Sequence, residues 1–300
     1  MILALTGATG FVGSHLLDLA LAEGHNVRAL ARRPQPPRKG VTWIGGALDR
    51  SDSLARMVAG ANATIHVAGV VNAPNRAGFA AGNAAGTAAM LEAATEAGMR
   101  RFVHVSSLAA REPDLSDYGW SKAEAERLVE ASALDWTIVR PPAIFGPRDT
   151  ELLELFRMAR RHVVPLPPAG GRLSVIAVED LTRLLLDLAT GQALVRAHVD
   201  PDDGTPNGWD HRAFARAIGD AVGTRVLPLP LPRPVLEGVS RIEHAIRGRR
   251  AKLTADRVRY FCHPDWVAQA RPPAEIWSPR LETRAALAAT AAWYRAAGLL

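Results

Sequence analysis

Apolar and polar positions along the first half of the chain alternate in a pattern that predicts short buried strands separated by helices. Apolar runs occur at residues 2–5, 27–30, 41–44, 63–68, 101–107 and 134–141. Stretches with helical periodicity separate most of them, notably residues 53–58 and 86–97. Because strands and helices alternate, we expect parallel strands joined by helical crossovers.

A glycine-spaced loop follows the first apolar run. Gly7, Gly10 and Gly13 form the pattern G-x-x-G-x-x-G between a strand and an amphipathic helix. Glycine permits a tight turn, close approach of a pyrophosphate to the backbone, and packing of the helix on the strand, while the helix N-terminus faces the phosphates. The strand–loop–helix context, more than the spacing alone, predicts a dinucleotide-binding site.

The later part of the chain has a different organisation. A strand at 173–178 followed by a helix at 179–189 is interpreted as a late return to the first sheet, whereas proline clusters punctuate the remainder. We therefore predict an α/β, doubly wound parallel-sheet Rossmann fold at residues 1–146, with 173–190 returning to it. Residues 147–172 and 191–300 are expected to form a smaller, mostly helical, substrate-binding lobe.

Composition narrows the possible classes. Three hundred residues with 48% hydrophobic content can bury a sizeable core. Cys262 is the only cysteine, which excludes an intramolecular disulfide and fits a reducing compartment, so we expect a cytoplasmic protein. No run approaches 18 uncharged apolar residues, so no integral membrane segment is expected. The net charge is +6, which could suggest binding to nucleic acid. The arginines are dispersed, however, and the sequence contains no recognisable nucleic-acid-binding motif. Binding of an anionic cofactor is sufficient to account for the positive charge. We predict no metal site.

Lys122 and Tyr118 are the strongest catalytic signal. The chain has only three lysines among 36 basic residues, and only three tyrosines. The two residues are four apart in a helix that opens near Ser116, so the phenol and the ammonium share a face. Exchange of a tyrosine proton near pH 7 requires a pKa lower by roughly three units, about 4 kcal/mol, to which a nearby cation contributes. The alternative is a solvated lysine beside a packed tyrosine.

Six ordered motifs carry a family resemblance. They are Thr6–Gly13, His66–Gly69, Asn83–Thr87, Val105–Ser107, Tyr118–Lys122 and Arg140–Pro147. Over roughly residues 1–190 the chain resembles the extended short-chain dehydrogenase/reductases, which include NAD(P)-dependent epimerase/dehydratase and 3β-hydroxysteroid dehydrogenase-like members.

The resemblance implies a catalytic trio. Ser107, the second serine of the pair that ends the fifth strand, would hydrogen-bond the substrate oxygen. Tyr118 would give or take a proton, and Lys122 would lower the phenol pKa while holding the nicotinamide ribose. Ser106 would pack near the nicotinamide. His66 and His104 are interpreted as strand-packing residues and not as acid–base groups.

The resemblance also implies a set of cofactor-binding residues, and the residues after the second strand bear on cofactor choice. An NAD enzyme usually has a carboxylate there, whereas this chain has Ala31-Arg32-Arg33, with Arg38-Lys39 following. Guanidinium donors favour the 2′-phosphate, so we predict NADP, with NAD the alternative if these arginines are simply solvated. Ala47 replaces a frequent aspartate, which leaves the adenine to the backbone at Leu48 or to Asp49. The full expected set is Gly7, Thr9, Gly10, Phe11, Val12, Gly13, Arg32, Lys39, Leu48, Val67, Ala68, Gly69, Ser106, Tyr118, Lys122, Pro141 and Ile144.

The sequence says less about the substrate. Sugar-nucleotide members usually carry an arginine-aspartate-aromatic run where this chain has Leu173-Ser174-Val175, which weakens that assignment. Val235, Val239, Ile242 and Ile246 share one helical face, which is expected to pack into the core or to roof an apolar pocket. The basic segment 247–252 is either solvated or binds an acidic substrate or an anionic membrane surface.

Three functions are compatible with these features. The favoured one is an oxidoreductase that transfers a hydride between NADP(H) and a small, rather apolar alcohol or ketone by a Ser-Tyr-Lys mechanism. The alternatives are a nucleotide-sugar epimerase or dehydratase and a non-catalytic cofactor-binding subunit. The catalytic trio argues against the non-catalytic subunit, because such a protein would need none of these three residues. Helices at 86–97 and 118–133 are those through which extended family members pair, so we expect a homodimer.

Overall fold

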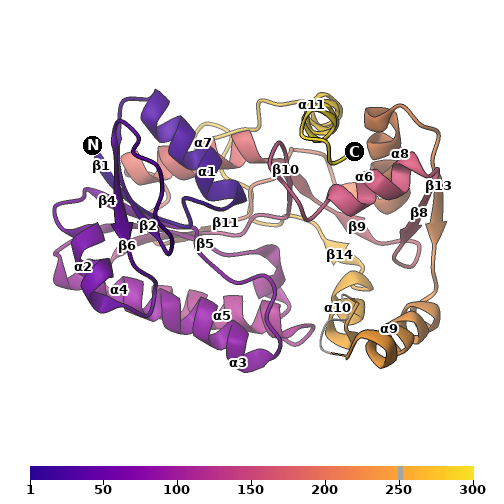
Figure 1. Ribbon diagram of the computed structural model, residues 1–300, viewed down its shortest axis with the longest axis horizontal. Coiled ribbons are helices and arrows are strands. Elements are labelled where there is room, and N and C mark those ends of the chain that lie inside the picture. Colours follow the sequence, from indigo (N-terminus) through magenta and orange to yellow (C-terminus); the bar gives the residue numbers. More distant parts are fainter. Residues whose placement is uncertain (249–252) are drawn as a thin grey trace. The chain divides into compact units, whose positions relative to one another are not determined.

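The computed structural model describes residues 1–248 and 253–300, which fall into two compact units (Figure 1). The first unit comprises Met1–Pro141, Glu179–Pro201 and Pro272–Trp277. The second comprises Pro142–Val178, Asp202–Arg271 and Ser278–Leu300.

A seven-stranded parallel sheet forms the centre of the first unit. Its strand order is β11-β6-β5-β4-β1-β2-β3, so the chain moves outward in one direction from β1 to β3 and then in the other from β4 onward. The α/β, doubly wound Rossmann prediction is confirmed. The strands are β1 (Ile2–Thr6), β2 (Asn26–Ala31), β3 (Val41–Gly45), β4 (Ala63–His66), β5 (Arg101–Val105), β6 (Asp135–Val139) and β11 (Ala197–Val199).

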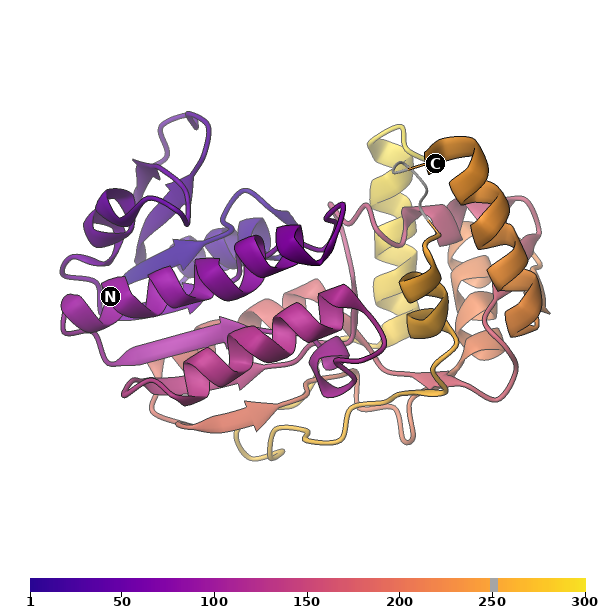
Figure 2. The same ribbon diagram turned by 90° about the horizontal axis from the view of Figure 1, so that it is seen from below.

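Helices cover both faces of this sheet. Figure 1 shows α1 and α7 on one face and α2, α4 and α5 on the other, and Figure 2 shows α4 and α5 side by side. On the second face the helices bury a core that includes Met57, Met90 and Val129 against Phe102 and Ile138 of the strands. The helices are α1 (Phe11–Ala22), α2 (Ser51–Val58), α3 (Arg76–Phe79), α4 (Gly86–Glu96), α5 (Asp117–Glu130) and α7 (Val178–Thr190). A π-helix (Ala80–Ala85) leads into α4, and a 3-10 helix (Leu108–Arg111) follows β5.

The prediction that residues 173–178 return to the central sheet is wrong. Within this stretch, β10 (Val175–Ala177) pairs with β7 (Ala143–Phe145) in a separate two-stranded sheet. The strand that returns is β11, which pairs with β6 after the chain has passed through α7. The helix predicted at 179–189 is present as α7.

The second unit is built from short strands and longer helices. Its core joins α6, α8 and α11, with Phe156 and Tyr294 in edge-to-face contact at 5.1 Å. The helices are α6 (Leu153–Arg160), α8 (His211–Val222), α9 (Arg233–Arg247), α10 (Ala255–Phe261) and α11 (Thr283–Ala296). The remaining strands are β8 (Val163–Leu166), β9 (Arg172–Leu173), β12 (Trp209–Asp210), β13 (Leu227–Pro230) and β14 (Asp265–Trp266).

The apolar stripe predicted on α9 exists, but it does not pack into the core. Val235, Val239, Ile242 and Ile246 are 45%, 46%, 63% and 78% exposed. Helical periodicity identified the shared face correctly, while the expectation of core burial is wrong. Of the basic segment 247–252, residues 249–252 lie outside the described residues.

Candidate active site

The loop between β1 and α1 forms a close backbone cradle. Gly7 has a left-handed φ of 77°, and the Gly10 amide donates to the Gly7 carbonyl at 2.9 Å. A Cβ on Gly13 would lie 2.0 Å from that carbonyl oxygen, and one on Gly7 would lie 2.9 Å from the Ala68 amide nitrogen. Side chains are therefore excluded where α1 begins. The amides of its first turn, which have no acceptor within the helix, can donate hydrogen bonds to an anion. These residues fit a dinucleotide pyrophosphate.

The predicted cofactor segments of the first unit follow the carboxyl ends of its parallel strands. Gly7 follows β1, Arg32 follows β2, Val67 follows β4, Ser106 follows β5, and Pro141 lies two residues beyond β6. Strand β1 lies between β2 and β4, so the direction of winding reverses there. Ligands of open α/β sheets bind at such a switch point.

The remaining predicted cofactor residues have varied settings. The side chains of Arg32 and Lys39 are exposed, whereas Arg38 pairs with Asp18 at 2.7 Å. Leu48 lies against the start of α4, where a Cβ on Gly86 would meet its Cδ1 at 2.8 Å. Ile144 lies on β7 of the second unit.

Lys122 is buried on α5 and points at the end of β5. Its side chain is 4% exposed, and Nζ donates to the Val105 carbonyl at 2.7 Å. Burial lowers the pKa of Lys122 to about 8, an effect that the nearby Glu126 carboxylate partly opposes. An ammonium held in this way is still mainly protonated at neutral pH, but it can lose its proton within the physiological range.

Tyr118 lies one turn before Lys122 on the same helix. The Ser116 hydroxyl caps this helix by accepting from the Gly119 amide at 3.0 Å, which fixes where α5 begins. The Tyr118 ring is half-buried and lies 6.1 Å from the Phe79 ring. Phenol and ammonium therefore start from one helical face, as the spacing predicted.

The two serines at the end of β5 have different environments. Ser107 caps the 3-10 helix, because its Oγ accepts from the Ala109 amide at 3.2 Å. Accepting that bond leaves its hydroxyl proton to be donated elsewhere. Ser106 is buried, and among the described residues its Oγ has no hydrogen-bond partner. The Lys122–Val105 contact links α5 to the strand end that carries both serines.

Asn83 is a site residue to which the sequence analysis gave no role. Its amide donates to Ser121 Oγ at 2.8 Å and to the Val70 carbonyl at 3.0 Å, and its Oδ1 accepts from the Val70 amide at 2.7 Å. The asparagine thus ties the loop after β4 to α5, next to Lys122. The available signal was its place at the head of the Asn83–Thr87 motif.

His66 and His104 stack inside the sheet at 5.5 Å and are almost fully buried. His66 Nδ1 lies 2.8 Å from Thr6 Oγ1, and Nε2 lies 3.1 Å from Thr87 Oγ1. Burial, together with the charge of Lys122, lowers the pKa of His66 to about 3 and that of His104 well below its usual value. Both imidazoles are therefore neutral, and their interpretation as strand-packing residues is confirmed.

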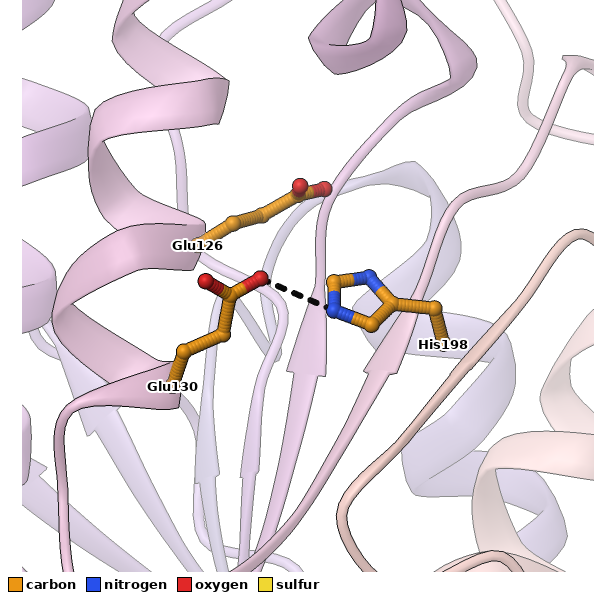
Figure 3. A group of neighbouring side chains, drawn as sticks. All are labelled: Glu126, Glu130 and His198. Atoms are coloured by element: carbon orange, nitrogen blue, oxygen red, sulfur yellow. Dashed lines mark ion pairs between the residues drawn. The ribbon is translucent and has the colours of Figure 1, made fainter.

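Glu126, Glu130 and His198 form a second cluster of titratable groups (Figure 3). Glu130 pairs with His198 at 2.9 Å. Both oxygens of Glu126 accept from Arg140, at 2.9 and 2.6 Å, in a bidentate pair. Because Arg140 engages the whole Glu126 carboxylate, the cluster is an ion-pair network that links α5 to the residue after β6 and to β11, and we assign no metal to it.

A dinucleotide cradle at the switch point of a parallel sheet, with a buried lysine one turn after a tyrosine, is typical of an NAD(P)-dependent enzyme. A family described as NAD(P)H-binding matches residues 7–159. A ceramide reductase from Caulobacter vibrioides is 36% identical over 307 residues, covering all of this chain and 96% of that protein. A 3-diazoavenalumate denitrifying reductase from a Streptomyces species is 30% identical and covers 87% of this chain and 96% of its own length.

Solved structures of low identity share the fold. MoeE5 in complex with UDP-glucose and NAD superposes with a TM-score of 0.75 at 22% identity, covering 99% of both chains. A UDP-N-acetylglucosamine 4-epimerase from Bacillus cereus has a TM-score of 0.72 at 14% identity, covering 98% of this chain and 96% of its own. The chain belongs to the extended short-chain dehydrogenase/reductase family and is an NAD(P)-dependent oxidoreductase. Within the described residues, no helix combines the length and apolar character needed to cross a bilayer.

Proposed function

We propose that the protein is an NADPH-dependent reductase that converts a ketone on an apolar, ceramide-like lipid into an alcohol. The observation that carries the chemistry is the buried Lys122 ammonium, held on the Val105 carbonyl beside Ser106 and Ser107 and one turn after Tyr118. The lipid class rests on the full-length similarity to a ceramide reductase. We assign recognition of the lipid body to the second unit, in keeping with the substrate-binding lobe expected at 147–172 and 191–300.

Each member of the trio has a distinct role in this proposal. Bound NADPH supplies the hydride that reaches the carbonyl carbon. Ser107 donates its hydroxyl proton in a hydrogen bond to the carbonyl oxygen and so orients the ketone. Tyr118 transfers its proton to that oxygen as charge develops there, and the phenol is later reprotonated from solvent. Lys122 stabilises the transient phenolate, because a cation favours the charged form of a neighbouring acid.

Asn83 has a positioning role in the same scheme. Its bonds to Ser121 and to both backbone groups of Val70 keep the loop 67–70, where Val67, Ala68 and Gly69 are expected to contact the cofactor, in register with α5. The proposed pyrophosphate cradle is Gly7, Thr9, Gly10, Phe11, Val12 and Gly13, with Leu48 at the adenine and Pro141 and Ile144 near the nicotinamide end.

Preference for NADP is part of the proposal. Arg32 directly follows β2, is exposed, and takes the place where a carboxylate would serve NAD. Arg38 is already paired with Asp18, so Lys39 is the better second cation for the 2′-phosphate. The single cysteine fits a reducing compartment, so we retain a cytoplasmic location within the proposal.

We also propose a homodimer that forms through α4 and α5. These helices leave a shallow surface groove, where Ala88, Leu91, Leu128 and Ala131 lie beside the polar residues Glu92, Thr95, Glu96 and Ser132. Small residues on two adjacent helices permit close packing against the same helices of a second copy across a two-fold axis.

The test is an NADPH-oxidation assay with three classes of substrate. Purified protein is incubated with a ceramide-like ketone in detergent micelles, with a short-chain ketone, and with UDP-glucose. We expect turnover of the lipid ketone, and a fall of about 10²-fold to 10⁴-fold in kcat for Tyr118→Phe with NADPH binding retained. Lys122→Arg should be nearly as damaging, because a planar guanidinium cannot occupy the point held by the ammonium.

Other outcomes identify the alternatives. Conversion of UDP-glucose without net NADPH consumption would instead support an epimerase. If the protein binds NADPH but turns over no ketone, and if Tyr118→Phe leaves NADPH binding unchanged, the result would support a non-catalytic cofactor-binding subunit.

A further inference from the structure

One helix of the second unit exposes an apolar face to solvent. The α9 outer face consists of Val235, Val239, Ile242 and Ile246, which recur at helical spacing and are 45–78% exposed. Leu227 and Leu229 on the preceding strand β13 are exposed as well, so six exposed large apolar side chains lie between residues 227 and 246. Such a concentration is unusual for a surface with no partner and is typical of a protein or membrane interaction site.

The side of α9 that flanks this face is already occupied. Ser240 is buried and donates to the Leu253 carbonyl at 2.8 Å, and Glu243 accepts from the Leu253 amide at 3.0 Å. These bonds hold α9 against the start of α10, its neighbour in Figure 1. The helix is therefore anchored in its unit by one side, and the exposure of its other side is a property of the fold and not of a detached segment.

The charge of this region points to an anionic occupant. In the sequence, residues 233–262 contain eight basic and three acidic residues, a net charge of +5. Three of the basic residues fall within 249–252, outside the described residues, and the described part of the segment has five basic and three acidic residues. Arg241 is exposed on α9 itself, and Arg257 and Arg259 lie on α10. An apolar helical face within a strongly basic segment is typical of helices that lie in the plane of a membrane with anionic lipids.

The length of α9 settles the mode of contact. Fifteen residues of helix span roughly 22 Å, less than the ~30 Å hydrocarbon core of a bilayer, so the helix can lie on a membrane but cannot cross it. We propose that the α9 outer face binds the surface of membranes that contain anionic phospholipids, with its four aliphatic side chains in the interface and Arg241, Arg257 and Arg259 at the headgroups. The α9 outer face includes none of the proposed catalytic residues, and its binding needs no turnover.

Vesicle flotation tests the proposal with the full chain. Protein is mixed with vesicles of phosphatidylcholine alone or with added phosphatidylglycerol and centrifuged through a density gradient. We expect flotation with the anionic vesicles, weaker flotation with the neutral ones, and loss of the difference at high salt. Ile242→Asp and Ile246→Asp should each lower the partition coefficient by about tenfold or more, because each places a charge in the apolar interface.

Two further variants sharpen the result. Leu281→Asp alters a residue of the same unit that is 41% exposed and lies outside this segment, so it should float like the wild type. Ile242→Trp should increase flotation, because tryptophan favours the membrane interface. The proposal is overturned if the wild type does not float with anionic vesicles or if Ile242→Asp floats equally well.

A second copy of the chain is the competing occupant. Light scattering of the wild type and of Ile242→Asp distinguishes the two, because membrane binding leaves the mass in solution unchanged by the substitution. A drop in mass would show that the face covers another copy, and the proposal would be wrong. Flotation is measured without cofactor or substrate, so a failure of the ceramide assignment leaves its outcome unaffected.

Discussion

Acid should destabilise the first unit through His66, whose imidazole is buried inside the parallel sheet. In the folded chain its pKa is lowered to about 3, first by burial and then by the charge of Lys122, whereas in the unfolded chain it returns to 6.5. Below pH 6.5 the unfolded chain therefore binds more protons than the folded chain, so stability is lost as the pH falls from 6.5 toward 3. Above pH 6.5 both states are neutral and this contribution disappears.

The magnitude follows from the width of that window. A difference of one unit between the two pKa values is worth 1.36 kcal/mol, so acidification from about pH 7.5 to about 4.5 should lower the free energy of unfolding by about 3 kcal/mol through His66. His104 acts in the same direction, since burial also lowers its pKa. Lys122 does not contribute there, because its folded pKa of about 8 and its unfolded value both lie above the window.

Urea unfolding at several pH values, followed by tryptophan fluorescence, to which Trp43, Trp120 and Trp136 of the first unit contribute, measures this effect. His66→Gln should be less stable at neutral pH, because the bridge between Thr6 and Thr87 is altered, but it should lose about 3 kcal/mol less than the wild type on acidification. His25→Gln, which alters a partly exposed histidine, should follow the wild-type curve. If His66→Gln shows the same loss with pH as the wild type, His66 is not the origin of the acid sensitivity.

Three further predictions follow from the site and its surroundings. Arg32→Ala should weaken NADPH binding by about 1.5–3 kcal/mol and leave NADH binding nearly unchanged, as titration calorimetry would show; a wild type that prefers NADH would contradict the proposed 2′-phosphate contact. Glu126→Gln should lower the free energy of unfolding by about 3 kcal/mol, because it removes the carboxylate that pairs with the Arg140 guanidinium, whose side chain is only 21% exposed. An unchanged midpoint of urea unfolding would refute this. Light scattering should give twice the 32.1 kDa of one chain, and Leu128→Asp in the α4–α5 groove should reduce it to that of one chain; a single-chain mass for the wild type would rule out the dimer.

Much of the first unit could be predicted because its signals are local. Each strand from β1 to β6 is a short apolar run, and helices separate all of these strands except β2 and β3. The glycine loop is constrained by its own backbone, because no side chain fits at Gly13. The parallel order then places the residues that follow these strands at one edge of the sheet. Spacing alone was sufficient to put Tyr118 and Lys122 on one helical face.

The errors arose where partners distant in sequence decide the structure. An apolar run of three residues such as β10 can pair with any exposed strand, and its sequence does not reveal that the partner is β7. The strand that does return to the central sheet is β11, which follows Leu194 and Arg196. Both are non-glycine residues with positive φ, and neither is a residue type that is typical of a turn. On α9, periodicity shows which residues share a face, but whether that face is covered depends on the rest of the unit.

The scarcity of lysine in this chain has a physical explanation at position 122. A generic surface cation can be an arginine, and 33 of the 36 basic residues are. At position 122 the cation is buried beside the Val105 carbonyl. The space around it is small, since a Cβ on Gly69 would come within 3.7 Å of its Nζ. A planar guanidinium has five hydrogen-bond donors, and this site could not supply an acceptor for each of them. Burial also disfavours the charge, and only an ammonium can respond by lowering its pKa to about 8, since arginine stays protonated in proteins. A lysine in an arginine-rich chain therefore marks a site that needs a compact buried cation, which is the property that the proposed stabilisation of the Tyr118 phenolate requires.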